Sequence, residues 1–315
     1  MTSGVKEGVL LVNLGTPDSP SPADIRQFLR RFLSDKRVIK RPDILWLPVL
    51  HGIVLRTRPH KVAKHYAQIR MDEGSPLTVY TTAQRDNLRR QLPHAVVETA
   101  MSYSKPYIPD VLETMLDAGV RKLTVIPLYP QYSSSTTGSV FDAVAKHFTG
   151  SERIIDLRFV ASFGEHPAYI TYFADRIRQT VRELGLDGVL FSYHNIPQSY
   201  VTDGDRYPFE CERTTGLIMQ QAGDIPHFMA YQSVFGRGLW MLPTTDHLLR
   251  TLPQKGVKRL LVAAPGFVAD NIETIWELGA EGRETFLRHG GEKYAYLPTF
   301  NKDSELAVIL KDLLQ

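Results

Sequence analysis

The sequence predicts an α/β protein with two similar Rossmann-like domains, each a four-stranded parallel sheet flanked by helices. Apolar runs of strand length alternate with amphipathic helical patterns along nearly all of the 315 residues. Such alternation implies right-handed βαβ units and parallel sheets. Four strand-like runs fall in each half of the chain. The length also fits two domains, at roughly 150 residues each.

The predicted strands are short apolar runs that end at turn-forming or polar residues. Helical patterns separate nearly all of them. In the first half they cover Val9–Asn13, Val96–Met101, Leu123–Leu128 and Ile154–Phe159; in the second half they cover Val189–Tyr193, Phe228–Gln232, Leu260–Ala264 and Tyr294–Leu297.

A helix is predicted directly after the first strand. Ser21 is a typical N-cap, Pro22 suits the first turn, and Asp24 places an acid near the positive end of the helix. The apolar side chains that follow recur at the spacing of one buried helical face. They are Ile25, Phe28, Leu29, Phe32 and Leu33.

The two halves contain similar segments. Residues 8–17 resemble residues 188–197, and residues 118–127 resemble residues 255–265. Each member of the second pair follows an amphipathic helix. We interpret the halves as two versions of one α/β domain.

The domain boundary is predicted near residues 150–165, around Thr149–Ser151. We predict an N-terminal α/β domain over residues 1–155 and a C-terminal α/β domain over residues 156–300. A last helix within residues 301–315 is expected to pack back on the first domain.

Composition excludes several classes of protein. The net charge is only +3, and no basic run is interleaved with aromatic residues, so nucleic acid is not an expected partner. The single cysteine, Cys211, excludes an intramolecular disulfide and a cysteine-built zinc or iron–sulfur site within one chain. Because the first residues lack the apolar core of a signal peptide, we expect a reducing, cytoplasmic location.

One apolar segment, Ile44–Leu55, is open to two interpretations. It is interrupted by Pro48 and His51 and is shorter than the ~18 apolar residues of a membrane span. It is either a buried core helix or an exposed apolar lip, within residues 44–58, that contacts a membrane or an apolar ligand.

Familiar nucleotide and hydrolase motifs are missing from the sequence. There is no G-x-x-x-x-G-K-[ST] loop and no G-x-G-x-x-G after a strand, so the α/β pattern lacks the usual phosphate-binding loops. There is no G-x-S-x-G elbow either. A nucleotide enzyme and a serine hydrolase are therefore disfavoured.

Chemically capable side chains lie where two predicted strands end. His194 ends one strand, and Asp270 and Glu273 follow another. Ligands of open α/β sheets bind beyond the carboxyl ends of the strands, so a metal or proton-transfer site is one interpretation. The other is structural, because Asp270 and Glu273 also fit a capping box and His194 fits a core position. Glu277, one turn later, extends an acidic ridge with Asp270 and Glu273.

Hydroxyl-rich loops follow the first and third strands, at Asn13–Pro17 and Tyr129–Gly138. They fit carboxylate or phosphate binding at a helix start. They fit ordinary turn and capping chemistry equally well.

These segments, taken together and in order, resemble the ferrochelatases, which insert ferrous iron into a porphyrin during haem synthesis. The S-x-H-x-x-P and D-x-x-E-T segments in combination are highly specific. The resemblance covers nearly the whole chain, and its clearest segments are Val12–Pro17, Phe32–Asp35, Glu73–Pro76, Tyr129–Ser133, Ser192–Pro197, Asp205–Pro208, Tyr231–Ser233 and Asp270–Thr274.

The resemblance implies a chelatase-like fold in which His194 and Glu273 face each other across a porphyrin cleft between the domains. They would abstract pyrrole protons and deliver Fe²⁺, with the division of labour between them left open. Asp270 and Glu277 match acidic residues behind Glu273. Fe²⁺ is then a substrate, and no cofactor is permanently bound. The implied porphyrin-binding residues are Arg58, Tyr66, Ser75, Tyr129, Trp240 and Phe267.

The sequence also departs from the family. Asn271 stands where many relatives have histidine, so an outer metal ligand is expected to be missing. With one cysteine, no iron–sulfur cluster is expected. Because the chain keeps the 44–58 lip, the resemblance favours protoporphyrin IX over coproporphyrin III. It further implies a cytoplasmic monomer that touches a membrane through this lip.

Three alternatives stay open at this point. A cobalt or nickel chelatase of the same superfamily would use paired histidines, whereas the partner of His194 here is Glu273. A non-catalytic haem or porphyrin carrier would need an axial ligand such as His194 but not Glu273. A periplasmic-type binding protein would need a signal peptide.

Overall fold

The computed structural model describes residues 5–236 and 238–315. The chain divides into two compact units. Unit 1 comprises Met1–Ala161 together with Lys302–Gln315, and unit 2 comprises Ser162–Asn301. Unit 1 therefore contains both ends of the chain, and unit 2 is one continuous stretch.

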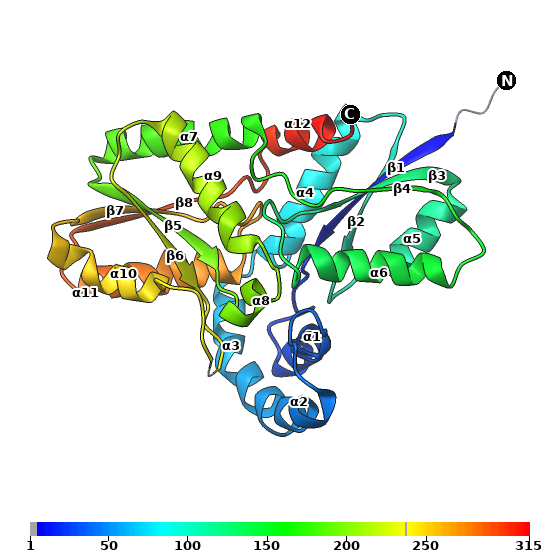
Figure 1. The fold of residues 1–315 in the computed structure, drawn as a ribbon, viewed down its shortest axis with the longest axis horizontal. Helices are drawn as coiled ribbons and strands as arrows, with labels where there is room; N and C mark the ends of the chain where they lie inside the picture. The colour runs from blue at the N-terminus through cyan, green and yellow to red at the C-terminus, as the bar shows by residue number, and fades with distance from the viewer. Residues whose placement is uncertain (1–4, 237) are drawn as a thin grey trace. The chain divides into compact units, whose positions relative to one another are not determined.

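Each unit contains a four-stranded sheet in which every strand pair is parallel, as the sequence predicts. The strand orders are β2-β1-β3-β4 and β6-β5-β7-β8, so both sheets share one topology (Figure 1). The strands are β1 Lys6–Asn13, β2 Val96–Met101, β3 Val120–Pro127, β4 Asp156–Phe159, β5 Gly188–His194, β6 His227–Gln232, β7 Arg259–Ala263 and β8 Lys293–Leu297.

In unit 1, helices α5 (Ile108–Asp117) and α6 (Thr137–Thr149) cover one face of the sheet, and their apolar residues join those of β1, β2 and β3 in one core. Helix α12 (Glu305–Asp312) packs along α4 (Pro76–Gln91). Asn87 of α4 donates from Nδ2 to the carbonyl of Lys302 at 3.0 Å, which fastens the start of this last segment.

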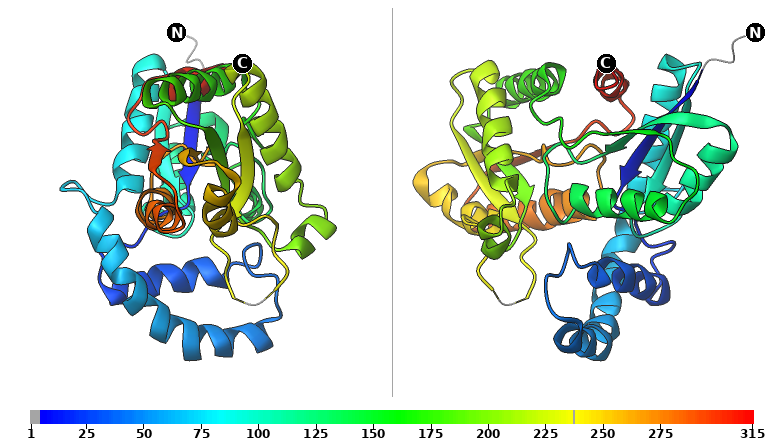
Figure 2. Two further views of the ribbon diagram at one scale, coloured as in Figure 1. Left: turned by 90° about the vertical axis from the view of Figure 1, so that its left-hand side faces the viewer. Right: turned by 45° about the vertical axis from the view of Figure 1, so that its right-hand side comes forward.

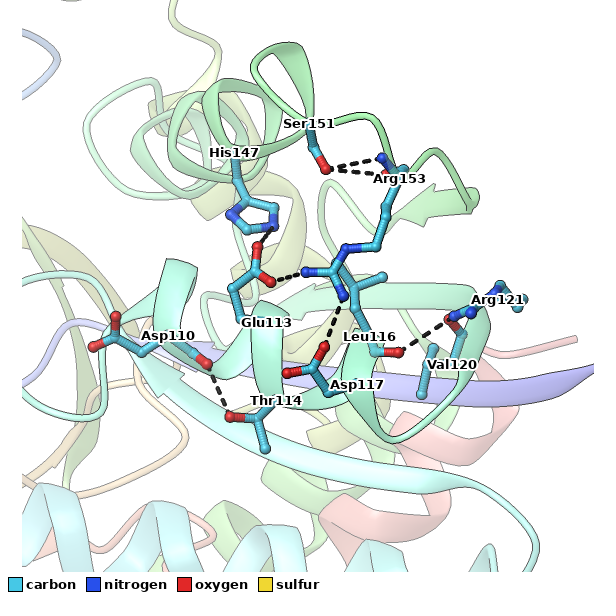
Figure 3. Close-up of polar contacts among 10 residues, drawn as sticks. All are labelled: Asp110, Glu113, Thr114, Leu116, Asp117, Val120, Arg121, His147, Ser151 and Arg153. Carbon is cyan, nitrogen blue, oxygen red and sulfur yellow. Dashed lines mark hydrogen bonds and ion pairs between the residues drawn. The ribbon is translucent and has the colours of Figure 1, made fainter.

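An ion-pair cluster fastens the segment that leads into β4 (Figure 3). Arg153 pairs with Glu113 and, at 2.7 Å, with Asp117, both on α5. Nε2 of His147, near the end of α6, lies 3.3 Å from Glu113. These contacts hold two helices and the strand entry together at the surface of unit 1.

Beyond the carboxyl end of β1, the chain forms an arm of helices (Figure 2). It consists of α1 (Pro22–Ser34), α2 (Asp43–Val49), the π-helix η1 (Leu50–Val54) and α3 (Leu55–Ile69). Ser21 caps α1, with its side chain accepting from the backbone N–H of Asp24 at 3.2 Å, as the sequence predicts.

The arm exposes an apolar edge. Ile44, Leu45 and Ile53 are 84%, 66% and 61% exposed, whereas Trp46 and Leu50 are buried. The buried-core interpretation of residues 44–55 is therefore wrong and the segment does form an exposed apolar lip, whose contact with a membrane or an apolar ligand stays a prediction. Within the described residues, no helix is long and apolar enough to cross a membrane.

In unit 2, α7 (Pro167–Leu184) and α9 (Tyr207–Ala222) lie on one side of the sheet (Figure 1). The other side packs on α10 (Thr245–Thr251), the π-helix η3 (Ile272–Gly282) and α11 (Arg283–Arg288). The short helices α8 (Gln198–Thr202) and η2 (Pro253–Lys255) complete the unit. Because side chains alternate along β5, Leu190, Ser192 and His194 share the face that carries η3.

Candidate active site

His194 and Glu273 both belong to unit 2. His194 is the last residue of β5, and Glu273 is the second residue of η3, which follows β7. Strands β5 and β7 are neighbours in the sheet. The carboxyl ends of parallel strands meet at one edge, so the topology brings both residues to the same edge and the same face.

The imidazole of His194 has a defined tautomer. Nδ1 lies 2.9 Å from the carbonyl oxygen of Asn195. A carbonyl can only accept, so this contact requires the proton on Nδ1 in the neutral ring. Nε2 then carries the lone pair, which can accept a proton or bind a metal ion.

The backbone of Glu273 is held at the start of η3 by an N-cap. This cap is Asn271, one residue after the predicted Asp270. Asn271 Oδ1 accepts from the N–H groups of Glu273 (3.0 Å) and Thr274 (3.2 Å). Thr274 Oγ1 in turn accepts from the N–H of Asn271 at 2.9 Å. The predicted capping box of Asp270 and Glu273 is wrong, since Asn271 and Thr274 form the box instead.

Asp270 does not join the predicted acidic ridge. It is 5% exposed, and both of its carboxylate oxygens accept hydrogen bonds, from the Tyr296 hydroxyl at 2.7 Å and Asn301 Nδ2 at 2.6 Å. Asn301 Oδ1 also accepts from the backbone N–H of Asp270 at 2.8 Å. Asp270 therefore anchors the loop before η3 to β8 and the segment after it.

The acidic ridge runs instead through Glu273, Glu277 and Glu281. The pKa of Glu277 is raised to about 7, mainly by burial and further by the charges of Glu273 and Glu281, while the Ser233 hydroxyl and His194 oppose the shift. Ser233 donates a short hydrogen bond to Glu277 Oε2. Sequence reasoning missed Glu281 and Ser233. The regular four-residue spacing of the three glutamates was the signal that could have found Glu281.

A groove of about 560 Å³ in unit 2 adjoins this ridge. Four carboxylate residues line it, and two arginines of the lining are already paired with two of them, Arg250 with Asp246 and Arg288 with Glu284. Glu277 and Glu281 are the acidic residues of the lining beyond these two pairs, so the groove has an acidic wall. Its other polar lining includes Gln232, Ser233, Thr244, Thr245 and Thr285.

The two aromatic residues predicted to contact porphyrin in unit 2 differ in their surroundings. Trp240 lies in the segment that follows β6 and forms an antiparallel bridge with Pro197, three residues after His194. Asn195 fastens the same segment through paired bonds to the backbone of Met241, at 3.0 and 3.1 Å. Phe267 is partly buried against the core beneath η3.

The remaining predicted porphyrin-binding residues lie in unit 1. Tyr66 and Ser75 line one small cavity of about 10 Å³, together with Thr16 from the loop after β1. The hydroxyls of Thr16 and Ser75 are 3.0 Å apart. Arg58 lies two turns before Tyr66 on α3 and does not line this cavity, and Tyr129 packs on the core beneath α5 and α6.

A preformed metal cage is not part of the described chain. In residues 5–236 and 238–315, no three His, Cys, Asp or Glu side chains are grouped to hold an ion.

Solved structures with the same fold are chelatases. The chain superimposes on the sirohydrochlorin chelatase SirB of Bacillus subtilis subspecies spizizenii in complex with cobalt, with a TM-score of 0.57, 10% identity, and coverage of 98% of this chain and 93% of that one. It also superimposes on CbiX of denitrifying bacteria, with a TM-score of 0.53, 15% identity, and coverage of 98% and 100%. At these identities the likeness shows the fold alone.

Sequence comparison identifies the family. The ferrochelatase family model matches residues 6–315. The chain is 49% identical to the coproporphyrin III ferrochelatase of Enterococcus faecalis, over 98% of this chain and 99% of that protein. It is 43% identical to the ferrochelatase of Yersinia pestis, over 98% of each. The chain belongs to the ferrochelatase family.

Proposed function

We propose that this protein inserts Fe²⁺ into a porphyrin, with His194 and Glu273 as the catalytic pair. The observation that supports this most directly is the meeting of His194, Glu273 and Glu277 at one sheet edge, in a chain of this family. The reaction needs no resident cofactor, because the metal is a substrate. Since one chain supplies all three groups, a monomer suffices.

The proposed chemistry exchanges two pyrrole protons for one metal ion. Nε2 of His194 accepts a proton, because its Nδ1 proton is committed to Asn195. Fe²⁺ accepts carboxylate and imidazole ligands, so Glu273 can hold the ion beside the ring. Glu277, with a pKa of about 7, can take up and release protons near neutral pH and pass them to the acidic groove.

For the porphyrin, we propose coproporphyrin III rather than protoporphyrin IX. Residues 22–69, which include the arm, contain eleven Lys and Arg against three Asp and Glu, a net charge of +8, while the whole chain carries +3. This local charge favours the porphyrin that has more carboxylates. The name of the 49% identical relative supports the same choice, and the exposed lip is the feature that supports protoporphyrin IX.

We also propose that the protein works in the cytoplasm and touches an anionic membrane surface through the lip, residues 44–58. The apolar edge of Ile44, Leu45 and Ile53 stands beside the basic residues of α3. Apolar side chains combined with positive charge favour binding at an anionic lipid interface. The single, buried cysteine is compatible with a reducing compartment.

The test is anaerobic Fe²⁺ insertion, followed by absorbance, with both porphyrins in competition. Wild type should metallate coproporphyrin III faster, and His194→Ala and Glu273→Gln should each lose most of the turnover. His94→Ala, which changes an exposed histidine of unit 1, should keep it. Binding of both porphyrins by wild type without metallation would instead identify a carrier.

A further inference from the structure

Gln232 contacts both catalytic candidates, His194 through strand pairing and Glu273 through a hydrogen bond from its side chain. It is the last residue of β6 and is paired in register with His194 of β5. It is 5% exposed, so its amide must find hydrogen-bond partners inside the protein. Its Nε2 donates to the carbonyl oxygen of Glu273 at 3.0 Å.

The orientation of this amide follows from its partners. The carbonyl of Glu273 can only accept, so the nitrogen of Gln232 must face it and Oε1 must face the other way. There Oε1 accepts from the Ser192 hydroxyl at 2.6 Å. Because the only proton of Ser192 is used in this bond, the Thr245 hydroxyl, 2.7 Å away, must donate to Ser192.

The result is a one-directional chain of hydrogen bonds from Thr245 through Ser192 and Gln232 to Glu273. Ser192 and Thr245 are 0% and 4% exposed, so water does not compete for these bonds. The chain starts on α10, crosses β5 and β6, and ends on the first turn of η3. Four elements are thus fixed against one another at the residue that carries the carboxylate.

We propose that Gln232 is the positioning residue for Glu273, and that Ser192 and Thr245 fix Gln232 in turn. Asn271 holds the N–H of Glu273 and Gln232 holds its carbonyl, so the backbone is restrained on both sides of the Cα atom. This inference rests on the proposed function, because it assigns Gln232 a role in placing the carboxylate for metal insertion.

The experiment compares Gln232→Met and Thr245→Val with Thr215→Val. Thr215 is an equally buried threonine whose hydroxyl is 2.9 Å from Tyr193, the next residue of β5, on the opposite face. For each variant, kcat and KM for coproporphyrin III and the melting temperature are measured. Gln232→Met should lower kcat by roughly 10–100-fold with KM little changed, since residues that orient metal ligands have effects of this size. Thr245→Val should lower kcat less, and Thr215→Val should lower only the melting temperature.

A double variant separates positioning from general loss of structure. If Gln232 acts through Glu273, Gln232→Met should cost no further activity in the Glu273→Gln background. An undiminished loss in that background overturns the proposal, as does unchanged kcat in Gln232→Met. If Gln232→Met does not fold, Thr245→Val carries the same comparison with Thr215→Val.

The outcomes also separate this inference from the proposed function. Wild type that fails to metallate any porphyrin, or Glu273→Gln that is fully active, contradicts the proposed function. Active wild type, inactive Glu273→Gln and fully active Gln232→Met contradict only the role of Gln232.

Discussion

At the scale of single residues, Glu273 and Glu277 lie on one helix but are held in place in different ways. The backbone of Glu273 is held on both sides, which fixes the origin of its side chain. Glu277 is held through its carboxyl group by Ser233, and burial shifts its protonation toward neutral pH. The first arrangement suits a ligand with a fixed position, and the second suits a group that exchanges protons.

The shifted pKa of Glu277 predicts a pH-dependent stability. A carboxyl whose pKa rises from 4.5 to about 7 on folding contributes stability that is fully present below pH 4.5 and is lost as the pH rises through about 7. Relative to wild type, Glu277→Gln should therefore gain free energy of unfolding, by roughly 1–3 kcal/mol, between pH 5 and pH 8. Urea unfolding in metal-free buffer measures this. Glu284→Gln, which changes an exposed acidic residue of the groove lining, gives the background, and a difference independent of pH would contradict the prediction.

The backbone conformation of Gly15 predicts that a substitution there destabilises the protein. Its φ of +97° favours glycine, and an added Cβ would overlap the Ser104 hydroxyl, which accepts from the N–H of Thr16 at 3.2 Å. Gly15→Ala should lower the free energy of unfolding by about 1–3 kcal/mol. It should also raise KM for porphyrin. The Thr16 hydroxyl would move away from the hydroxyl of Ser75, which is predicted to bind porphyrin.

Gly216→Ala is the control for that substitution. Gly216 lies in α9, where an added Cβ meets nothing within 4 Å. Replacing a helical glycine there should stabilise the protein by up to about 1 kcal/mol. Equal effects of the two substitutions in thermal melts would rule out the role given to Gly15.

Individual residues of the site could be predicted from the sequence only in part. His194 and Glu273 stand out because they follow buried strands. The cap was misplaced by one position because Asp270 and Asn271 are equally good N-caps in sequence. The role proposed for Gln232 could not be predicted, since its side-chain partners, Ser192 and Glu273, come from two other elements.

At the scale of elements, the strands were predictable and the π-helices were not. Most of the strands contain a short apolar run, and hydrophobic periodicity detects such runs directly. The π-helix η3 could not be predicted, because the sequence of residues 272–282 has the pattern of an ordinary amphipathic α-helix. The lip was ambiguous because the apolar character of a segment does not show whether other parts of the protein bury it or leave it exposed to solvent.

The exposed lip of α2 and η1 predicts binding to lipid. The double substitution Ile44→Ser and Ile53→Ser should abolish sedimentation with vesicles that contain anionic phospholipid, without loss of fold, because both side chains are mostly exposed. Ile154→Ser is the matched control, since Ile154 is also 84% exposed in unit 1 but lies outside the arm. Retained binding by the double variant, or lost binding by the control, would show that the lip is not the contact.

At the scale of the whole molecule, the repeat of one parallel α/β domain was visible in the sequence, because both halves alternate strand-like and helical patterns. The strand order that the two sheets share was not predicted. The exact extent of the units was less visible. Residues 302–315 belong to unit 1 although they follow unit 2 in the chain, and this depends on the contact of α12 with α4.

That contact predicts a measurable share of stability. Leu310 of α12 is fully buried, and Leu310→Ala should lower the free energy of unfolding by about 2–4 kcal/mol. Val308→Ala, on the same helix at 46% exposure, should change it by less than about 0.5 kcal/mol. Chemical denaturation compares the two, and a small effect of Leu310→Ala would mean that α12 is not part of the folded core of unit 1.

The return of residues 302–315 to unit 1 has a consequence for synthesis on the ribosome. Unit 2 is contiguous, so all of its residues are translated before residues 302–315 of unit 1. Unit 1 begins first, but residues 302–315 are translated after unit 2, and until they emerge the surface of α4 that α12 will cover stays open. The residues of unit 2 are therefore complete before those of unit 1, and during that interval the uncovered surface of α4 is one that a chaperone could bind.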